Sequence, residues 1–289
     1  MLSFLLRLFN FANLNNQLFI QDHNAKNLSY TVEENQFIDQ NYTDEFFLSE
    51  NHIVLNNTTE FVEFVEFELD HVPFKVDWRK NHKVSSVKNQ LHCGGCWAFS
   101  SSGAVESAWA IKNNVLYNLS QQELIDCSSD YGNHGCEGGS MDLGFQYIID
   151  NGLCTNLTYP YIASDQECQK DCSSVVNITK YGDLRQNDEF NLLLGVAQQP
   201  VSVAIQANKR SFQLYQSGIY SDLDCGTQLD HGVLVVGYSY DYENDMKYWI
   251  IKNSWGPEWG ENGYIRILRD VEDERGLCGI AMQPSIPIV

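Results

Sequence analysis

The nine cysteines of this 289-residue chain constrain its fold most strongly, because all of them lie between Cys93 and Cys278. An odd number of cysteines in a cysteine-rich chain fits paired disulfides with one thiol left free. Since disulfides persist in oxidising compartments, the pattern favours a protein that is secreted or kept in such a compartment. Buried, reduced cysteines in a cytosolic protein are the alternative interpretation.

Charge divides the chain into two segments. Residues 1–71 carry 12 acidic and 2 basic side chains, whereas the rest of the chain carries 26 and 16. The composition changes at Val72-Pro73, where we place the boundary. The net charge of −20 argues against nucleic-acid binding, which requires a basic surface.

The first residues give a poor targeting signal. Met1 to Phe11 is apolar, but Arg7 interrupts it and no small-residue cleavage site follows, so we favour an amphipathic helix over a signal peptide. No run of about 18 apolar residues exists, and we expect no membrane span. Residues 1–48 are typical of a helix followed by a short extended piece. Residues 61–69 alternate Phe or Val with Glu, which indicates a strand or an extended segment.

The two halves of the remaining chain differ in their expected secondary structure. A helix is expected over residues 96–113, a second from Ser120, where Glu123 completes a capping box, and a third from Ser140 to Asp150. After Tyr181, β-branched and aromatic runs predict strands over residues 201–206, 232–240, 247–253 and 263–268. Helices followed by strands predict an α+β protein with two lobes.

Three side chains are candidates for nucleophilic catalysis. Cys96 follows the turn sequence Cys93-Gly94-Gly95 and begins a predicted helix, where unpaired amide groups favour the thiolate. His231 precedes a predicted strand and Asn253 ends the next one, so the pair can act as a base and its orienting group. A single histidine is more often structural, and the prediction therefore depends on the combination.

Five motifs, in this order along the chain, resemble those of papain-like cysteine peptidases. They are 87–100 (VKNQLHCGGCWAFS), 229–232 (LDHG), 252–256 (KNSWG), 259–264 (WGENGY) and 276–279 (GLCG). The resemblance covers about residues 72–289, and Gly95 stands where that family has Ser or Ala. Leu91-His92 departs from the usual Gly-Ser or Gly-Gln, and we expect His92 to face solvent.

The resemblance implies a two-lobed papain-like fold. A helical left lobe (about 82–180) and a β-barrel-like right lobe (about 181–289) would enclose the active-site cleft. An α-helical and extended propeptide would precede both lobes in the chain. Within the cleft, Cys96 would attack the peptide carbonyl and His231 would return the proton to the leaving amine. Asn253 would orient the imidazole and Trp255 would shield that hydrogen bond. Gln90, with the Cys96 N–H, would donate to the oxyanion.

The resemblance also implies the substrate-binding residues. By motif position they are Gly138 and Gly139, which would pair with an extended peptide, and Met141, Ala204, Leu229 and Gln283, which would line its specificity pocket. Asp230 and Trp255 are further expected substrate-binding residues. Neutral Gln283 at the floor predicts Leu, Val or Phe two positions before the scissile bond and poor acceptance of Arg. Without the resemblance, Met141 and Leu229 fit ordinary core packing equally well. No paired-histidine insertion is visible, which favours internal cleavage of proteins and peptides.

The other eight cysteines find partners by the same resemblance. The implied disulfides are Cys93–Cys136, Cys127–Cys168, Cys225–Cys278 and an additional Cys154–Cys172, similar to a bridge in some protozoan relatives. A zinc site is the rival interpretation, but no Cys-x-x-Cys pair faces another at the usual spacing. Cys93-x-x-Cys96 alone also suggests a redox motif, which the histidine and asparagine motifs outweigh. We expect no metal and no cofactor.

Residues 1–71 resemble a shortened propeptide. Asn35-Gln36-Phe37-Ile38-Asp39 is similar to the family's Gly-x-Asn-x-Phe-x-Asp element, with Glu33 where Gly is usual. The resemblance implies an intramolecular inhibitor that is removed at low pH, and hence a monomeric zymogen of a lysosome, a vacuole or the secretory route. A catalytically silent binding or storage protein is the alternative, as is a separate inhibitory role for residues 1–71. Seven Asn-x-Ser/Thr sequences are compatible with a glycoprotein.

Overall fold

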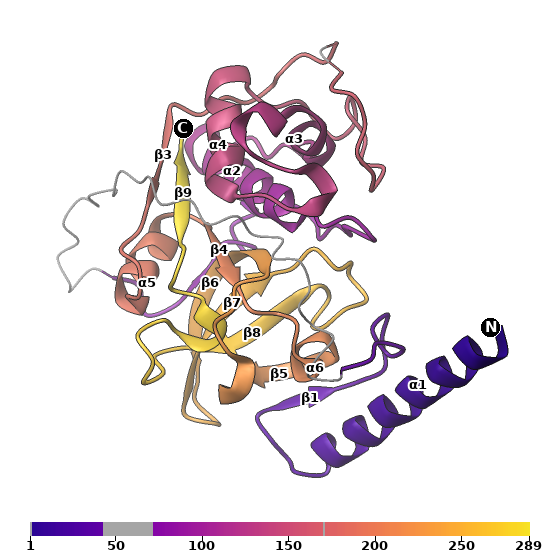
Figure 1. Cartoon of the computed structure of the whole chain (residues 1–289). Helices are drawn as coiled ribbons and strands as arrows, with labels where there is room; N and C mark the ends of the chain where they lie inside the picture. Colours follow the sequence, from indigo (N-terminus) through magenta and orange to yellow (C-terminus); the bar gives the residue numbers. More distant parts are fainter. Residues whose placement is uncertain (1, 43–71, 170) are drawn as a thin grey trace.

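Two regions of different secondary structure make up the body of the molecule. The computed structural model describes residues 2–42, 72–169 and 171–289, with side chains from Ala12 onward. We name the region of α2 (Cys96–Asn113), α3 (Gln121–Cys127) and α4 (Met141–Asn151) the helical lobe. The strand lobe contains β4 (Val201–Ile205), β5 (Tyr215–Tyr220), β6 (His231–Asp241), β7 (Met246–Lys252) and β8 (Tyr264–Leu268). Figure 1 shows the helical lobe above the strand lobe.

The remaining elements connect the lobes or flank them. They are α1 (Leu2–Asn24), β1 (Tyr30–Val32), β2 (Val76–Asp77), β3 (Lys180–Asp183), α5 (Glu189–Gln198), α6 (Arg210–Gln213) and β9 (Ser285–Ile288). Short 3₁₀ helices cover Ser129–Tyr131, Gly135–Glu137, Leu223–Cys225 and Leu277–Gly279. The C-terminal strand β9 pairs with β3 and rises from the strand lobe to the helices (Figure 1).

Local sequence explains where the helices begin. Ser120 caps α3, because its hydroxyl accepts a hydrogen bond from the Glu123 backbone N–H at 3.0 Å, which confirms the predicted helix start. The other half of the predicted capping box does not form, since the Ser120 backbone N–H donates to the Cys154 carbonyl at 2.9 Å. The helices α2 and α4 and the strands β4, β6, β7 and β8 lie where the patterns predict them. α5 was not predicted. It begins after Asp188, whose carboxylate accepts from the Asn191 N–H at 2.8 Å.

The strands form one open sheet. Its order is β1-β5-β8-β7-β6-β4-β9-β3, with β2 pairing onto β6. Only β5 and β8 run parallel; the other pairs are antiparallel. The prediction of a barrel-like lobe is therefore wrong in one respect, since no pairing among the described residues joins β1 to β3 and closes the sheet.

Each lobe has its own apolar core. The strand-lobe core contains aromatic side chains that are almost fully buried, among them Trp249, Trp259, Phe212 and Tyr215. The helical-lobe core is built around Trp97 and extends across the junction to Leu234 and Ile250 of the strand lobe. Because the second core draws on both lobes, the groups that face each other across the junction are held at fixed separations.

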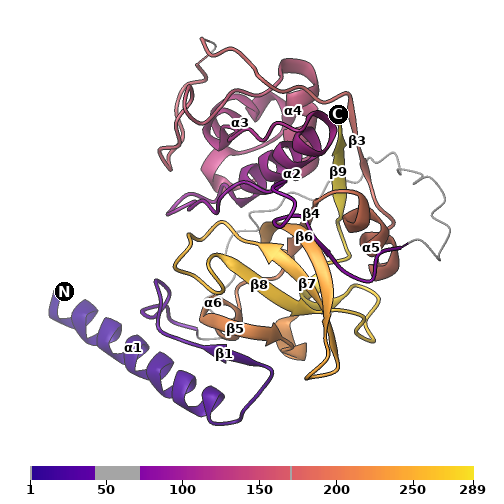
Figure 2. The ribbon, with the colours of Figure 1, turned by 180° about the vertical axis from the view of Figure 1, so that it is seen from behind.

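The N-terminal segment packs on the outer side of the strand lobe. β1 pairs antiparallel with β5, and α1 lies beyond it in both views (Figures 1 and 2). No helix in the described part of the chain is both long and apolar enough to cross a bilayer. The alternating segment 61–69 and most of the approach to the boundary at residue 72 lie outside the described residues.

Candidate active site

Cys96 is a buried free thiol at the first residue of α2. The other eight cysteines form disulfides, and the Cys96 side chain is 1% exposed. Gly95 precedes the helix where relatives have a slightly larger residue. A Cβ at Gly95 would lie 2.9 Å from Ile125 Cδ1, so the glycine relieves a close contact beside the cysteine.

Burial works against ionisation of the Cys96 thiol in this form of the chain. Desolvation raises the pKa of the Cys96 thiol to about 12, although backbone hydrogen bonds from Gly232 and Trp97 lower it. The expectation of a favoured thiolate is thus only partly met: the helix N-terminus acts in the predicted direction, but desolvation outweighs it. The negative charge of Asp230 adds to the increase.

His231 and Asn253 are brought together by adjacent strands. His231 begins β6, Asn253 directly follows β7, and the two strands pair antiparallel. The imidazole Nε2 lies 2.7 Å from Asn253 Oδ1, and the Trp255 ring stacks on the imidazole at 4.7 Å. Since a carbonyl oxygen only accepts, Nε2 carries a proton and Nδ1 is the nitrogen that can exchange one with a thiol.

Gly232 brings the histidine to the cysteine. A Cβ on Gly232 would lie 3.3 Å from the Trp97 backbone N, and the Gly232 backbone hydrogen-bonds to the Cys96 thiol. His231 directly precedes Gly232 in the chain, and Cys96 directly precedes Trp97. His231 and Cys96 therefore flank a close backbone contact between the two lobes.

Gln90 is fixed by several hydrogen bonds, one of them to the turn that leads into Cys96. Its backbone N–H donates to the Ser254 carbonyl at 2.8 Å, and its Oε1 accepts from the Ser254 hydroxyl at 2.5 Å. The Nε2 group donates to the Cys93 carbonyl at 3.0 Å, and the Tyr161 hydroxyl donates to the Gln90 carbonyl at 2.6 Å. The roles of Ser254 and Tyr161 were not predicted, although Ser254 lies within a motif.

The predicted substrate-binding residues gather on one side of this centre. Met141, Ala204 and Leu229 belong to one buried cluster, and Gly232 separates Met141 from the cysteine helix. Gly139 lies against the Trp97 ring, so close that a Cβ would approach it to 2.8 Å. Asp230 faces the backbone instead, where its Oδ1 accepts from the Ala207 N–H at 2.7 Å.

Gln283 lies next to two acidic side chains that the sequence analysis did not identify. It lines a cavity of about 10 Å³ together with Met141, Asp142 and Asp183. Burial raises the pKa of Asp142 to about 6. Gln283 therefore shares its cavity with two carboxyl groups.

The four disulfides join the pairs that the resemblance implies. They are Cys93–Cys136, Cys127–Cys168, Cys154–Cys172 and Cys225–Cys278. Three of them lie in or beside the helical lobe, and Cys93–Cys136 fixes the turn that leads into Cys96. The fourth joins Leu223–Cys225 to Leu277–Gly279 in the strand lobe.

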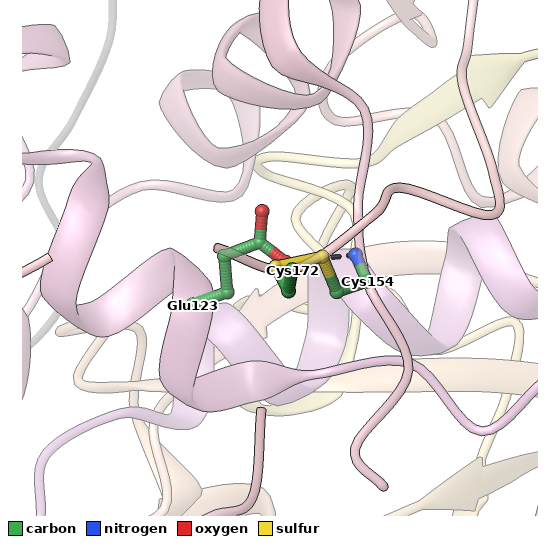
Figure 3. Close-up of side chains that lie close together, drawn as sticks. All are labelled: Glu123, Cys154 and Cys172. Carbon is green, nitrogen blue, oxygen red and sulfur yellow. Dashed lines mark hydrogen bonds between the residues drawn. A yellow bond between two sulfur atoms is a disulfide. The ribbon is translucent and has the colours of Figure 1, made fainter. Parts of the chain in front are cut away.

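One group of possible metal ligands occurs in the described part of the chain. Glu123 and the sulfur atoms of Cys154 and Cys172 lie within 4.8 Å of one another (Figure 3). The sulfurs are joined as a disulfide, whereas metal binding requires thiolates. The Glu123 carboxylate accepts from the Cys154 N–H at 2.7 Å and from the Tyr147 hydroxyl at 3.1 Å, so its role here is structural.

Residues of the N-terminal segment contact the same centre. Gln36 Nε2 donates to the Trp255 carbonyl at 3.0 Å, and the Phe37 ring meets the Trp255 ring edge-on at 4.8 Å. Asn35 Nδ2 donates to the Gln213 carbonyl at 2.8 Å. The segment that resembles the propeptide element is thus placed against the tryptophan that stacks on His231.

A buried free cysteine at a helix N-terminus, beside a histidine bound to an asparagine, defines the class of cysteine hydrolases. Residues 72–288 match the family described as papain family cysteine protease. The chain therefore belongs to the papain family of cysteine proteases, which are hydrolases.

Similarity to individual proteins extends into the N-terminal segment. Probable cysteine protease RD21B of Arabidopsis thaliana is 46% identical over 282 residues, which cover 94% of this chain and 59% of that protein. A recombinant stem bromelain precursor matches with a TM-score of 0.89 at 38% identity, covering 98% of this chain and 91% of its own. Digestive procathepsin L 3 of the Tenebrio molitor larval midgut matches with a TM-score of 0.87 at 42% identity and the same coverage.

Proposed function

We propose that this chain is the precursor of an endopeptidase that hydrolyses peptide bonds through Cys96, His231 and Asn253. The convergence of the three at the junction of the lobes carries the proposal. His231 Nε2 is bound to Asn253 at 2.7 Å, and the adjoining Gly232 contacts the first turn of the cysteine helix. This leaves Nδ1 to take the thiol proton, and the resulting thiolate attacks the peptide carbonyl.

In the next step, negative charge develops on the carbonyl oxygen. Gln90 Nε2, which donates to the Cys93 carbonyl in this form, and the Cys96 N–H are the donors that would stabilise it. The imidazolium then returns its proton to the leaving amine, which releases the C-terminal product and leaves an acyl group on Cys96. Water hydrolyses the thioester with His231 as base, and Trp255 keeps bulk solvent from the His231–Asn253 hydrogen bond.

Residues 1–71 act in this proposal as an intramolecular inhibitor, and residues 72–289 are the mature enzyme. The contacts of Gln36 and Phe37 with Trp255 support it, as do the matching structures of a bromelain precursor and a procathepsin. Burial of Cys96 raises the pKa of its thiol, which fits a precursor whose nucleophile becomes ionised only after the site opens.

Acid would weaken the inhibitory contact through His23 of α1. Its side chain is 5% exposed, packs on the Tyr30 ring at 4.5 Å and hydrogen-bonds to the Tyr30 carbonyl at 3.3 Å. Burial lowers the pKa of His23 below 6.5. Because the folded form resists protonation, the stability of this contact falls as the pH drops from about 6.5 through the folded pKa.

The proposed substrates are proteins and peptides with Leu, Val or Phe two residues before the cut. Met141, Ala204 and Leu229 supply the apolar surroundings, and Gln283 limits the entry of Arg. The disulfides support an oxidising compartment, and we propose an acidic one: a lysosome, a vacuole or the secretory route. We further propose a monomer that is glycosylated at one or more of its Asn-x-Ser/Thr sequences.

Active-site labelling tests the catalytic proposal. After incubation at about pH 4–5, where carboxylates begin to protonate, Cys96 should be alkylated stoichiometrically by iodoacetate, and N-terminal sequencing should give a start near Val72. His231→Ala should abolish the fast labelling and the cleavage of a Leu-containing peptide. Labelling of His231→Ala at the wild-type rate, or a folded chain without activity, would instead support a silent binding or storage protein.

A further inference from the structure

A small polar cavity lies directly behind the His231–Asn253 pair. It has a volume of about 20 Å³ and is bounded by Glu106 of α2, Gln121 of α3, Lys252 of β7 and Asn253 itself. These residues come from both lobes. The volume suffices for one water molecule and for nothing larger, since one water needs at least about 10–15 Å³.

The cavity walls carry more positive than negative charge. Among the residues lining it, Lys88 and Lys252 contribute amino groups and Glu106 contributes a carboxylate. Lys88 Nζ lies 2.9 Å from Glu106 Oε1, whereas Lys252 Nζ donates to the Ser85 hydroxyl at 2.8 Å. Burial lowers the pKa of Lys252 to about 8. The Lys252 ammonium group therefore has donor capacity beyond its bond to Ser85.

Two neutral side chains at the cavity each leave one polar atom unsatisfied. Gln121 is 1% exposed; its Nε2 donates to the Ser102 hydroxyl at 2.6 Å, but its Oε1 has no hydrogen-bond partner among the described residues. Asn253 is 3% exposed; its Oδ1 binds His231, but its Nδ2 lacks a partner in the same part of the chain. Such orphaned buried groups usually indicate an internal water.

We propose that the cavity is a site for one internal water molecule and that Gln121 thereby acts as a positioning residue for Asn253. The water accepts hydrogen bonds from Asn253 Nδ2 and from the Lys252 ammonium group, and it donates one to Gln121 Oε1. A water with three polar partners is typical of buried sites. An anion is disfavoured because the Glu106 carboxylate lines the same small space.

The consequence for catalysis concerns the orientation of the Asn253 carboxamide. Asn253 Oδ1 accepts from His231 Nε2–H at 2.7 Å and from the Ser254 backbone N–H at 2.8 Å, so two bonds already turn it toward the histidine. The water adds a bond at the other end of the carboxamide, on Nδ2, and so restricts its rocking against the imidazolium. Without the water, Nδ2 would have no partner among the described residues, and Oδ1 would be held less firmly against Nε2–H. The inference rests on the proposed function, since it concerns the rate of that reaction.

A pair of adjacent glutamines allows a matched test in the full-length chain after acid activation. Gln121→Leu should fill the cavity and lower kcat by about 2- to 10-fold, the effect of one lost hydrogen bond, with KM unchanged. Gln122 is equally buried in the same helix, but its Nε2 donates to Asp126 Oδ1 at 2.8 Å and to the Ser164 carbonyl at 2.7 Å, away from the cavity. Gln122→Leu should destabilise the protein and leave kcat unchanged.

Gln121→Glu keeps an acceptor oxygen in place and should retain kcat within about twofold of the wild type. This change is smaller than the one expected from the loss of one hydrogen bond. Equal kcat values for Gln121→Leu and the wild type, or an equal loss in Gln122→Leu, would overturn the proposal. If the leucine variants fail to fold, a high-resolution crystal structure of the wild-type chain tests the proposal instead. A cavity without a water molecule in that structure would also overturn the proposal. Absence of activity in the wild type would count against the proposed function and leave the crystallographic test of the water in place.

Discussion

The helical lobe and the strand lobe are stabilised in different ways. Three of the four disulfides lie in or beside the helical lobe, with sequence separations of 43, 41 and 18 between their cysteines. The strand lobe has one disulfide and relies on a core of buried aromatic rings, in which Trp259 packs against Phe212 and Tyr215. The helical lobe thus adds three covalent cross-links to its apolar core, whereas the strand lobe depends mainly on the burial of apolar surface.

Catalysis needs both lobes because the proposed groups are divided between them. Cys96 and Gln90 belong to the helical side, and His231, Asn253 and Trp255 belong to the strand lobe. A change that loosens either lobe should therefore reach the rate of reaction, but through different physical routes. The following predictions test this difference, from the largest expected effect to the smallest.

Loss of Trp259 should have the largest effect on stability. Its side chain is fully buried, its Nε1 donates to the Gln213 carbonyl at 2.9 Å, and its ring lies 5.1 Å from that of Trp255. Trp259→Ala should lower the free energy of unfolding by about 3–5 kcal/mol in urea titrations. The half-buried Trp109 of α2 is the matched control, and an equal loss in Trp109→Ala would contradict the proposed dependence of the strand lobe on its aromatic core.

Removal of the Gln90 amide should affect the rate instead of the fold. Gln90→Ala should lower kcat by about 10²–10³, equivalent to roughly 2.7–4 kcal/mol of transition-state stabilisation. Ser254→Ala removes only the hydroxyl that holds Gln90 Oε1 and should cost about 2- to 10-fold. Steady-state kinetics on one Leu-containing peptide checks both, and a similar loss in the two variants would show that Gln90 does not contact the oxyanion.

The additional disulfide should contribute measurably to the helical lobe. Replacing Cys154 and Cys172 together by Ser opens an 18-residue loop and should lower the free energy of unfolding by about 3 kcal/mol. Hydrogen exchange should show the loss at α3 and α4 and leave β6 and β7 protected. Uniform loss of protection would mean that the lobes unfold as one unit and that the distinction between them has no energetic basis.

The smallest effect should be a change of selectivity with pH. Burial raises the pKa of Asp142 to about 6, so this carboxyl group is largely neutral at pH 5 and largely ionised at pH 7. The ratio of kcat/KM for an Arg peptide to that for a matched Leu peptide should therefore rise severalfold across this interval. Any effect of pH on the catalytic groups changes kcat/KM for both peptides by the same factor and therefore cancels in the ratio. Asp142→Asn should abolish the rise, and an unchanged slope in that variant would exclude Asp142 as its source.

Features that depend on a few neighbouring residues were predictable from the sequence. Ser120 and Glu123 mark the start of α3, and the glycines before Cys96 place the cysteine at the beginning of α2. The motifs also give the disulfide partners and the pairing of His231 with Asn253. The helix starts follow from local residue chemistry, whereas the disulfide partners and the pairing of His231 with Asn253 were implied by the resemblance to papain-like peptidases.

Features that depend on distant contacts were not predictable. The open sheet results from pairings such as β5 with β8 and β3 with β9, which no local pattern encodes. The raised pKa of the Cys96 thiol follows from burial in the folded chain, and the charges of Glu106 and Lys252 act on each other only because the helical lobe packs against the strand lobe. α5 has a local signal in Asp188, but its apolar residues resemble those of a strand.

The pairing of β1 with β5 has a consequence for the molecule after maturation. β1 pairs Tyr30 with Gly218 and Thr31 with Ser217, so the outer backbone of β5 is saturated as long as the N-terminal segment is present. Cleavage near residue 72 would leave this row of N–H and C=O groups facing solvent. Such an uncovered edge is a template for self-association. By this logic the N-terminal segment protects the newly made protein from aggregation as well as from premature activity.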